Sequence, residues 1–509
     1  MNRTITIAAA LGLLLAAGMA RGSIAPAGAG RAQPSAEVSE ATLQLKQAFT
    51  DVGNGDDKKA APELDRVIAA PSFDQLPAEL RFQTLNVAAV IAFQDKQYAK
   101  AHRLAIRATG FDQATGAAWT ARLFAALYAG DNPDAGRCVE ALARQWPQQL
   151  DDIRPQGIAQ SHYALRIAHE DDVDRAMLNA LFDANWQAEY SDYDTLWRDL
   201  ALLEIEHNEN KHAAMVAQRI RSADAALSMR IDKRFDPITR GQPQAFDVDH
   251  LLEAQIQAAR AQIRAHPDQL RPVVRLRDLL IEKGRNAEVL AVSDAAVAHA
   301  ERGDGNKTYT DFSEAYNWVL NQRSLALAHD GRWDDAVREM TRAAKRPEGG
   351  GVNVSQSINL AGLFTDLDQP DKAAAAVVEP GEMSPYGNMQ LQYVKLQIAI
   401  EKNDTGAIAR HMAYLQQHRT DDIATWERAL LRHGDLDAAA ALLIQRLNAP
   451  DWRSGALVEM QQHYVHIEQT PIMKTMDQRW NAVTARPDVQ AALAKVGRVE
   501  RFDVVALAY

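Results

Sequence analysis

A helical hairpin that recurs along the chain constrains the fold more than any other feature. Its clearest copy is LALAHDGRWDDAVREMTRAA, residues 325–344. Gly331 stands between the two apolar runs and can adopt the positive φ that ends a helix. After it, the apolar residues follow the spacing of one helix face, at Trp333, Ala336, Val337, Met340 and Ala343. Two such helices cannot bury both of their apolar faces alone, so each hairpin needs neighbours.

Copies of this pattern occur in both halves of the sequence. Small residues that would let two helices approach closely recur near one period. Ala101 and Ala135 are 34 residues apart, and Ala336 and Ala373 are 37 apart. Several copies replace the turn glycine, and most lack a closing proline. The sequence therefore predicts an all-α solenoid of antiparallel helical hairpins, with each hairpin packed on the next.

These copies resemble the tetratricopeptide repeat (TPR) family, in degenerate form and of an exported bacterial type. The resemblance is closest in 85–108 and 320–344, and it covers about 300 residues in all. It implies a TPR-like superhelix, in one array or in two half-arrays, with an inner groove that binds a protein or peptide. It implies no common chemistry beyond binding.

The composition agrees with an all-helical chain and argues against nucleic acid as the main partner. Alanine, the best helix former, is abundant, and charged residues make up 24% of the chain, as in an ordinary globular protein. The net charge is −11, and no block of Lys and Arg stands out. Nucleic acid is therefore not expected as the main partner.

The amino-terminal stretch predicts export. Residues 1–20 have a basic start at Arg3, a short apolar core and small residues before Arg21, which is typical of a secretory signal peptide. The core is short for a membrane span, so we expect none in the mature chain, although an uncleaved anchor is an alternative. Residues 21–37 are rich in Gly, Ala and Pro and read as a flexible lead-in. The expected location is the periplasm.

Loop-forming residues divide the remaining sequence. The stretch 230–250 holds Pro and Gly with few apolar residues, and it predicts a linker. The resulting segments are an amino-terminal TPR-like array at 38–229, a second array at 251–450 and a C-terminal helical cap at 451–509. The string AALSMRIDKRFD at 225–236 has an echo in AALAKVGRVERFD at 491–503, which suggests similar closing elements for two half-arrays.

Chemical motifs are scarce. No Walker loop, GxSxG, HExxH, CxxC or GxGxxG occurs, so we predict no catalytic residues and no cofactor. The start of a calcium-loop pattern at Asp304 lacks its closing Glu, and His463 with His466 shows no third or fourth ligand, so no metal site is predicted. The lone Cys138 lies in a helical context and reads as a small buried residue.

Six side chains are candidate ligand contacts. Trp318 and Asn321, with Gln83 and Asn86 in an early copy, fall on the helix face that lines the inner groove in the resembled family. Trp186 and Tyr190 belong to the aromatic and acidic stretch FDANWQAEYSDYDTLW, which could bind a sugar or a peptide. The alternative for Trp186 is a packing role in the core.

The predicted function is a non-catalytic, exported TPR-like scaffold that binds a protein or peptide, in envelope assembly or secretion. The alternative is a carbohydrate-active helical toroid or an accessory of polysaccharide export or peptidoglycan processing, with a glycan as ligand. An enzyme of that class would need two carboxylates in a groove, and a pair near Trp186 or Trp318 would favour it. The oligomeric state is left open.

Overall fold

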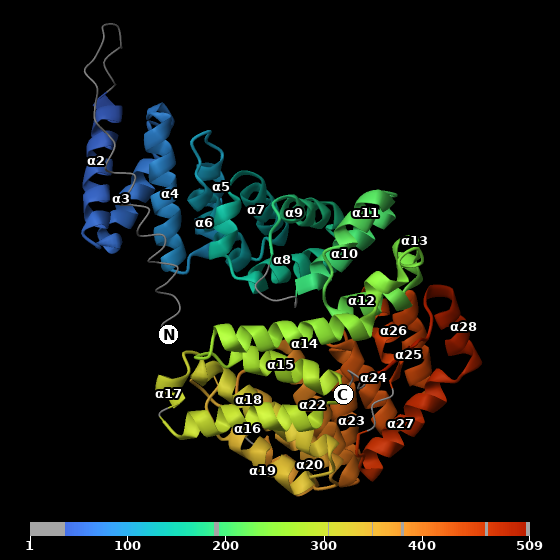
Figure 1. Cartoon of the computed structure of the whole chain (residues 1–509). Coiled ribbons are helices and arrows are strands. Elements are labelled where there is room, and N and C mark those ends of the chain that lie inside the picture. Colours follow the sequence, from blue (N-terminus) through green and yellow to red (C-terminus); the bar gives the residue numbers. More distant parts are fainter. Residues whose placement is uncertain are drawn as a thin grey trace. The chain divides into compact units, whose positions relative to one another are not determined.

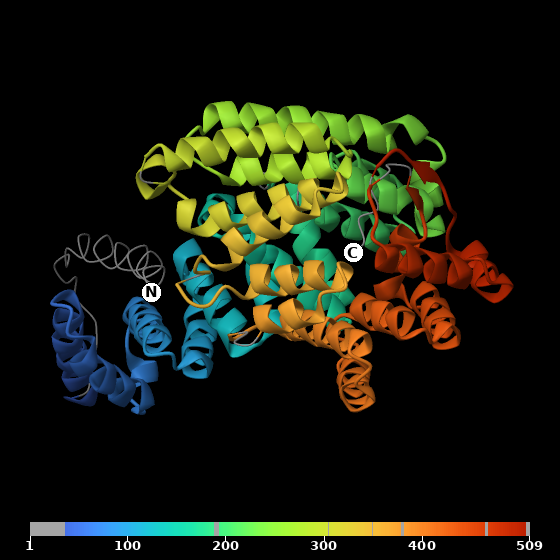
Figure 2. The same ribbon diagram turned by 90° about the horizontal axis from the view of Figure 1, so that it is seen from below.

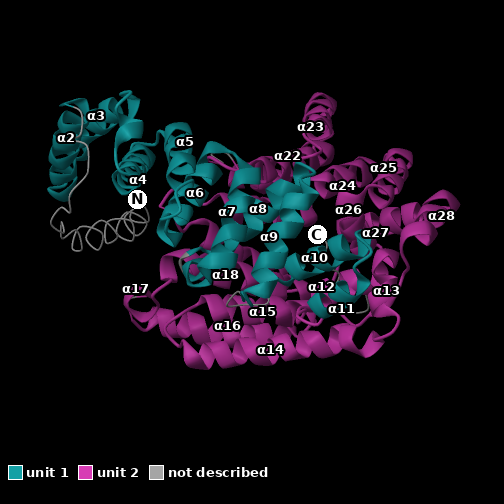
Figure 3. Ribbon diagram, turned by 90° about the horizontal axis from the view of Figure 1, so that it is seen from above, with its two compact units in different colours: residues 1–216 teal, residues 217–509 magenta. Residues whose placement is uncertain are grey.

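The computed structural model describes residues 36–187, 193–303, 305–348, 350–377, 381–463 and 467–504. Helices dominate these ranges (Figure 1). Two compact units divide the chain at Val216 and Ala217, as Figure 3 shows by colour. The predicted signal peptide at 1–20 and most of the lead-in lie outside the described residues. Within the described ranges, no helix is both long and apolar enough to cross a membrane.

Unit 1 is a file of helical hairpins in which the helices up to residue 206 pack on their neighbours in chain order. Its elements are α2 (Ala36–Gly53), α3 (Asp57–Ala69), η1 (Phe73–Gln75), α4 (Ala78–Gln94), α5 (Tyr98–Thr109), α6 (Gly116–Ala129), α7 (Asn132–Gln145), η2 (Pro147–Asp152), α8 (Pro155–Ile167), α9 (Asp171–Asp183), α10 (Asp194–Glu206) and α11 (Asn210–Ala217). Apolar residues of α2 through α6 form one continuous core along the file.

Unit 2 continues the same pattern and ends in two very short strands. Its first elements are α12 (Ala223–Ile231), η4 (Lys233–Phe235), α13 (Asp236–Thr239), η5 (Pro243–Phe246), α14 (Val248–Ala265), α15 (Arg271–Glu282), α16 (Asn286–Glu301), α17 (Gly305–Thr308), α18 (Phe312–His329) and α19 (Trp333–Ala344). Its later elements are α20 (Val354–Asp366), α21 (Pro370–Ala376), α22 (Pro385–Glu401), α23 (Thr405–Gln417), α24 (Ile423–His433), α25 (Leu436–Asn448), α26 (Pro450–Glu459), β1 (Gln462–His463), α27 (Pro471–Thr484), α28 (Pro487–Val496) and β2 (Arg501–Phe502). The long yellow-green helices α14, α15 and α16 lie side by side in Figure 2.

The predicted fold class is confirmed: the described chain is an all-α array of TPR-like antiparallel hairpins. Gly331 ends α18 with a φ of 73°, as expected. Copies without a turn glycine place another residue in the same left-handed conformation, among them Asp368 (φ 56°) and Asn403 (φ 55°). Asn and Asp tolerate this region because their short polar side chains can bond to the local backbone.

Small residues sit where the paired helices approach most closely. Ala101, Ala135, Ala336 and Ala373 are all fully buried. In the α18–α19 hairpin, the Ser324 hydroxyl donates a 2.7 Å hydrogen bond to the carbonyl of Ala336. This bond ties the first helix of the hairpin to the backbone of the second at the position of Ala336.

The two ends of unit 2 meet and close it into a ring. Helix α12 contacts α14 on one side and α26 on the other, and α14 through α26 pack in succession. Residues 225–236 and 491–503, the two segments whose sequences echo one another, lie against each other, and we call this pair the clasp. Asp232 and Gly497 form an antiparallel bridge across it, and β1 pairs in parallel with β2 beside it.

Charged side chains hold the clasp together. Arg230 forms a 2.5 Å ion pair with Glu500, and its guanidinium lies over the ring of Phe502. Arg498 donates to the backbone carbonyl of Arg230 and to the carboxylate of Asp236. The stretch 230–250, predicted as a linker, lies within unit 2 and contains short helices there.

Candidate functional site

The candidate site lies on the first helices of successive hairpins in unit 2: α15, α18, α20, α22 and α24. Helix α15 contacts α18, α20 contacts α22 and α22 contacts α24, and a side-chain hydrogen bond between Asn359 and Asn321 joins α20 to α18. We call their shared surface the first-helix face. It carries the sequence-predicted residues Trp318 and Asn321 on α18.

A chain of amide side chains crosses three of these helices. The side-chain amide of Asn359, an exposed residue of α20, donates a 2.8 Å bond to Oδ1 of Asn321. Asn321 in turn donates to Oε1 of Gln322 at 3.3 Å, and Gln322 donates to the carboxylate of Asp278 on α15. These bonds fix the orientation of each amide, so the row is preorganised to meet polar groups of a ligand.

Two large apolar side chains are exposed beside this row. Trp318 is 38% exposed and Leu325 is 37% exposed, and both belong to α18. They are seven residues apart, which places them on one face of the helix, two turns from each other. Aromatic and aliphatic side chains that remain in solvent next to fixed polar groups are typical of protein-binding surfaces.

Helix α18, which carries Trp318, is contacted by a buried arginine of α15. Arg277 of α15 is fully buried, and its Nη1 donates a 3.5 Å bond to the backbone carbonyl of Trp318. Burial lowers the pKa of Arg277 to about 9. A buried guanidinium with so little pairing is costly, so this contact is a constraint on how α15 and α18 pack.

The first-helix face continues on α22 and α24 with a second polar group. Gln390 donates to Asp422 at 2.8 Å and to the hydroxyl of Thr425 at 2.6 Å. Arg428 donates to the same hydroxyl at 2.7 Å, and its guanidinium lies 5.3 Å from the centre of the Tyr393 ring. A cation held over an aromatic face this way keeps both side chains in a fixed orientation.

Charged residues occupy the carboxyl-terminal ends of the same helices. Arg432 of α24 donates a 2.7 Å bond to Glu401 of α22. Burial raises the pKa of Glu401 to about 7 and that of Asp366, at the end of α20, to about 6, while Arg432 acts in the opposite direction on both. The first-helix face therefore carries amide and aromatic side chains near Trp318. At the carboxyl-terminal ends of its helices it carries the titratable acids Asp366 and Glu401.

The other predicted contacts lie elsewhere. Gln83 and Asn86 are half-buried residues of α4 in unit 1, where Gln83 donates a 2.7 Å bond to Glu79 of its own helix. Trp186 is 8% exposed and packs against Trp197 with ring centres 6.2 Å apart, so it has little surface to offer a ligand. Tyr190 lies outside the described residues.

The structure adds Leu325, Gln322, Asn359 and Asp278 to the site. A sequence signal existed for two of them. Leu325 follows Trp318 by two helical turns, and Asn359 stands in the next hairpin near the place that Asn321 has in its own. The pairing of Gln322 with Asp278 had no signal, because it depends on how α15 and α18 are rotated against one another.

Metal ligands and the single cysteine are the remaining candidates for chemistry in the described chain. No group of three or more His, Cys, Asp or Glu within them is placed to hold a metal ion. Asp304 and His466 lie outside the described residues, and so does the side chain of His463. Cys138 is fully buried in α7, and burial raises the pKa of its thiol far above the usual range, so it packs as a small apolar residue.

Comparisons with known proteins leave the family open. No family model matches the chain, and no curated protein matches it. The structure of Naa15/Naa10 bound to HypK-THB matches 83% of this chain and 70% of that chain at 14% identity, with a TM-score of 0.24. The APC/C hetero-tetramer Cut9–Hcn1 matches 90% of this chain and 96% of that chain at 13% identity, with a TM-score of 0.26. Yeast Tom70 matches 90% of this chain and 99% of that chain at 10% identity, with a TM-score of 0.21. These TM-scores are too low to transfer any property, and the fold assignment rests on the hairpin contacts themselves.

Proposed function

We propose that this protein is a non-catalytic, TPR-like scaffold that binds a protein partner through the first-helix face of unit 2. One observation carries the proposal. Trp318 and Leu325 are exposed on one side of α18, beside amides that are already fixed by the Asn359–Asn321–Gln322–Asp278 chain. An apolar anchor flanked by oriented polar groups matches the usual composition of a binding hot spot.

The amide row favours an extended backbone as its ligand. Amide side chains both donate and accept, which are the two roles that a peptide unit also offers. Trp318 and Leu325 would then receive apolar side chains of the bound segment.

The place of action that we propose is the periplasm. Its support is the pattern of residues 1–20, a basic start followed by a short apolar core and small residues. The proposed role is envelope assembly or secretion, where an exported scaffold would hold a partner protein. Detection of the mature chain in a periplasmic fraction, with processing near Ala20, tests this part of the proposal.

A second candidate is a glycan-binding or glycan-processing helical ring. The observation that favours it is the closure of unit 2 by the clasp. Against it, the carboxylates Asp366 and Glu401 are the last residues of α20 and α22, whereas Trp318 lies in the second turn of α18. The acids and the exposed aromatic ring therefore occupy opposite ends of their helices, which does not suit one sugar subsite.

Affinity purification from the native envelope tests the leading proposal. Tagged wild type is compared with the double variant Trp318→Ala/Asn359→Ala and with Tyr163→Ala, which removes an aromatic ring that is 65% exposed on α8 of unit 1. We expect a partner protein with wild type and Tyr163→Ala that is depleted at least about tenfold by the double variant. Retention on a polysaccharide column together with no protein partner would contradict the proposal and favour the second candidate.

A further inference from the structure

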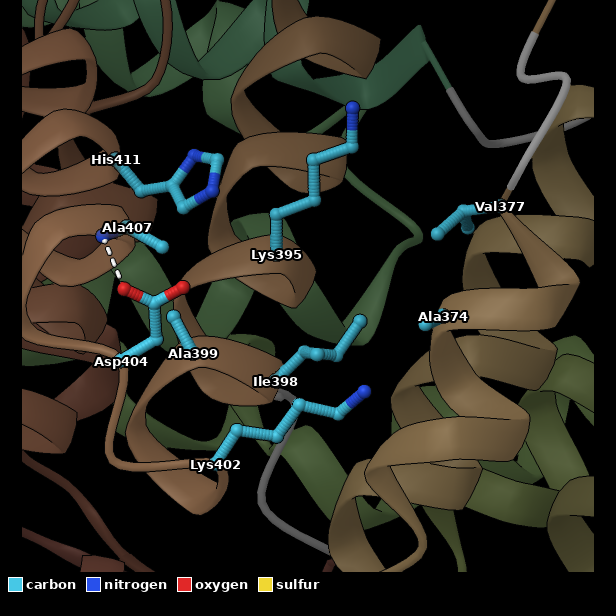
Figure 4. Close-up of a pocket in the computed structure, with 9 residues that line it drawn as sticks. All are labelled: Ala374, Val377, Lys395, Ile398, Ala399, Lys402, Asp404, Ala407 and His411. Carbon is cyan, nitrogen blue, oxygen red and sulfur yellow. Dashed lines mark hydrogen bonds between the residues drawn. The ribbon is translucent and has the colours of Figure 1, made fainter.

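A cavity of about 200 Å³ lies between α21, α22 and α23, away from the amide row (Figure 4). It exists because α21 is short. Helix α21 has 7 residues, whereas α19 before it has 12 and α23 after it has 13. A second helix of ordinary length would cover the side of α22 that α21 leaves open.

The floor of the cavity is apolar. Small and branched side chains come from all three helices: Ala374 and Val377 from the α21 end, Ile398 and Ala399 from α22, and Ala407 from α23. Figure 4 shows Ile398 between the two helices that flank the opening. A volume of about 200 Å³ is below the range of drug-sized pockets, so the cavity suits a short aliphatic group.

The rim of the cavity is basic. Lys395, Lys402 and His411 line it together with one acid, Asp404. Lys395 and Lys402 stand two turns apart on the same face of α22, with Ile398 between them in sequence. Figure 4 shows the two lysine side chains on opposite sides of Ile398.

Two of these charged groups are already engaged. Lys402 forms a 2.6 Å ion pair with Asp371 of α21, and Asp404 caps α23 by accepting a 2.9 Å hydrogen bond from the backbone of Ala407. His411 is hydrogen-bonded to Gln392 at 2.7 Å. Lys395 has no ion-pair or hydrogen-bond partner within the described parts of the chain. Among the described residues, Lys395 is therefore a rim cation that no ion pair or hydrogen bond engages.

The ammonium of Lys395 acts on the neighbouring His411. Burial lowers the pKa of His411, and the charges of Lys395 and Arg410 lower it further, whereas Asp404 raises it. A ligand that brings a negative charge beside Lys395 would relieve this repulsion.

We propose that this cavity binds a small aliphatic carboxylate, with the carboxylate on the ammonium of Lys395 and the hydrocarbon on Ile398, Ala399 and Ala374. The ammonium supplies charge-assisted hydrogen bonds, and the apolar floor removes the hydrocarbon from water. The carboxylate belongs either to a free aliphatic acid or to the chain end of a peptide that finishes in an aliphatic residue. This site is separate from the first-helix face and does not depend on the function proposed above.

Titration calorimetry with the full chain tests this assignment. The probe is sodium hexanoate, and hexanol is the matched probe that lacks the charge. We expect saturable binding of hexanoate and at least about tenfold weaker binding of hexanol, because hexanol cannot form the charge-assisted hydrogen bond with Lys395. Equal binding of the two probes, or no binding of hexanoate, would overturn the assignment.

Substitutions at the cavity test whether hexanoate binds there. Lys395→Met keeps most of the side-chain stem but removes the charge, and it should reduce hexanoate affinity to that of hexanol. Lys395→Arg should retain at least part of the affinity. Ala399→Leu should fill the cavity and weaken both probes. The control Lys474→Met removes one lysine from an exposed position on α27 and should leave binding unchanged. A loss of affinity in Lys474→Met equal to that in Lys395→Met would contradict a site at the cavity.

A competition experiment with peptides distinguishes a free aliphatic acid from the chain end of a peptide. A short peptide ending in leucine is compared as the free acid and as the amide. Competition with hexanoate by the free acid alone identifies a peptide chain end as an occupant. Failure of both peptides to compete, with hexanoate still bound, restricts the site to free acids.

Discussion

Arg230 and Glu500 are 270 positions apart in the chain and form a 2.5 Å ion pair. The pair joins the first helix of unit 2 to the strand region that ends it. It lies within a set of contacts that also includes the Asp232–Gly497 bridge and the bonds from Arg498. Unit 2 is therefore a closed array rather than a file with two free ends.

The ion pair should contribute measurable coupling. A double-mutant cycle with Arg230→Met and Glu500→Gln should give a coupling free energy of about 1 kcal/mol, the upper part of the range for partly exposed pairs. The measurement is the thermal or urea stability of unit 2 in the four proteins. Strict additivity of the two substitutions would show that the pair does not hold the clasp.

Gly497 should be intolerant of a side chain. A Cβ there would lie 2.3 Å from Cδ2 of Leu457 and 2.9 Å from the carbonyl oxygen of Ile231. Gly497→Ala should therefore destabilise unit 2 by about 1–3 kcal/mol. The control Gly362→Ala introduces a Cβ within α20 where nothing lies within 4 Å, and it should be neutral or stabilising by up to about 1 kcal/mol. The reverse order of stability would contradict the packing of the clasp.

Loss of the C-terminal segment should affect helices that are distant in sequence. In a chain truncated after Glu459, amide exchange should accelerate in α12 and α14 as well as in α25 and α26. Helix α12 loses the Arg230–Glu500 pair and the Asp232–Gly497 bridge, and α25 loses its packing against α27 and α28. In an open file of repeats, only the hairpins next to the cut would lose protection. Hydrogen exchange by mass spectrometry distinguishes the two, and unchanged protection of α12 would argue against closure.

In unit 1, His162 should stabilise the fold in a pH-dependent way. Its Nδ1 is 2.8 Å from Asp174 and its Nε2 is 3.0 Å from Asp199, and all three side chains are buried. Burial alone would lower the pKa of His162, but the two carboxylates raise it to about 9. Since this value is above the unfolded one, the stabilisation is complete below about pH 6.5 and is lost as pH rises through about 9.

The variant His162→Gln tests this prediction. At pH 6 it should lower the free energy of opening of α8 to α10 by about 3 kcal/mol, because Asp174 loses its paired cation while Asp199 keeps Arg198 and Arg166. The difference from wild type should shrink toward pH 9.5. The control His418→Gln alters a histidine in a more exposed pair with Asp421 and should show no comparable trend. A pH-independent difference would show that His162 is not charged in the folded protein.

The sequence predicted the hairpins but not the closure, for a physical reason. Helix periodicity, small residues such as Ala336 and turn positions such as Gly331 are local signals, and each was found where expected. The clasp joins residues far apart in the chain, and its only sequence sign was the echo between 225–236 and 491–503. The same limit applies to the site. Trp318 and Asn321 could be placed on α18 from spacing, whereas the bond from Gln322 to Asp278 depends on the packing of two helices.

Site-specific photocrosslinking tests the proposed binding face most directly. A photoreactive residue is placed at Leu325, beside Trp318 on α18, and at Leu43, which is 68% exposed on α2 of unit 1, as the control. In the native envelope, position 325 should yield a discrete protein adduct that position 43 does not give, and Asn359→Ala should abolish it. The same adducts at both positions, or an adduct at 325 that persists when Trp318 and Asn359 are both replaced by alanine, would contradict binding at the first-helix face.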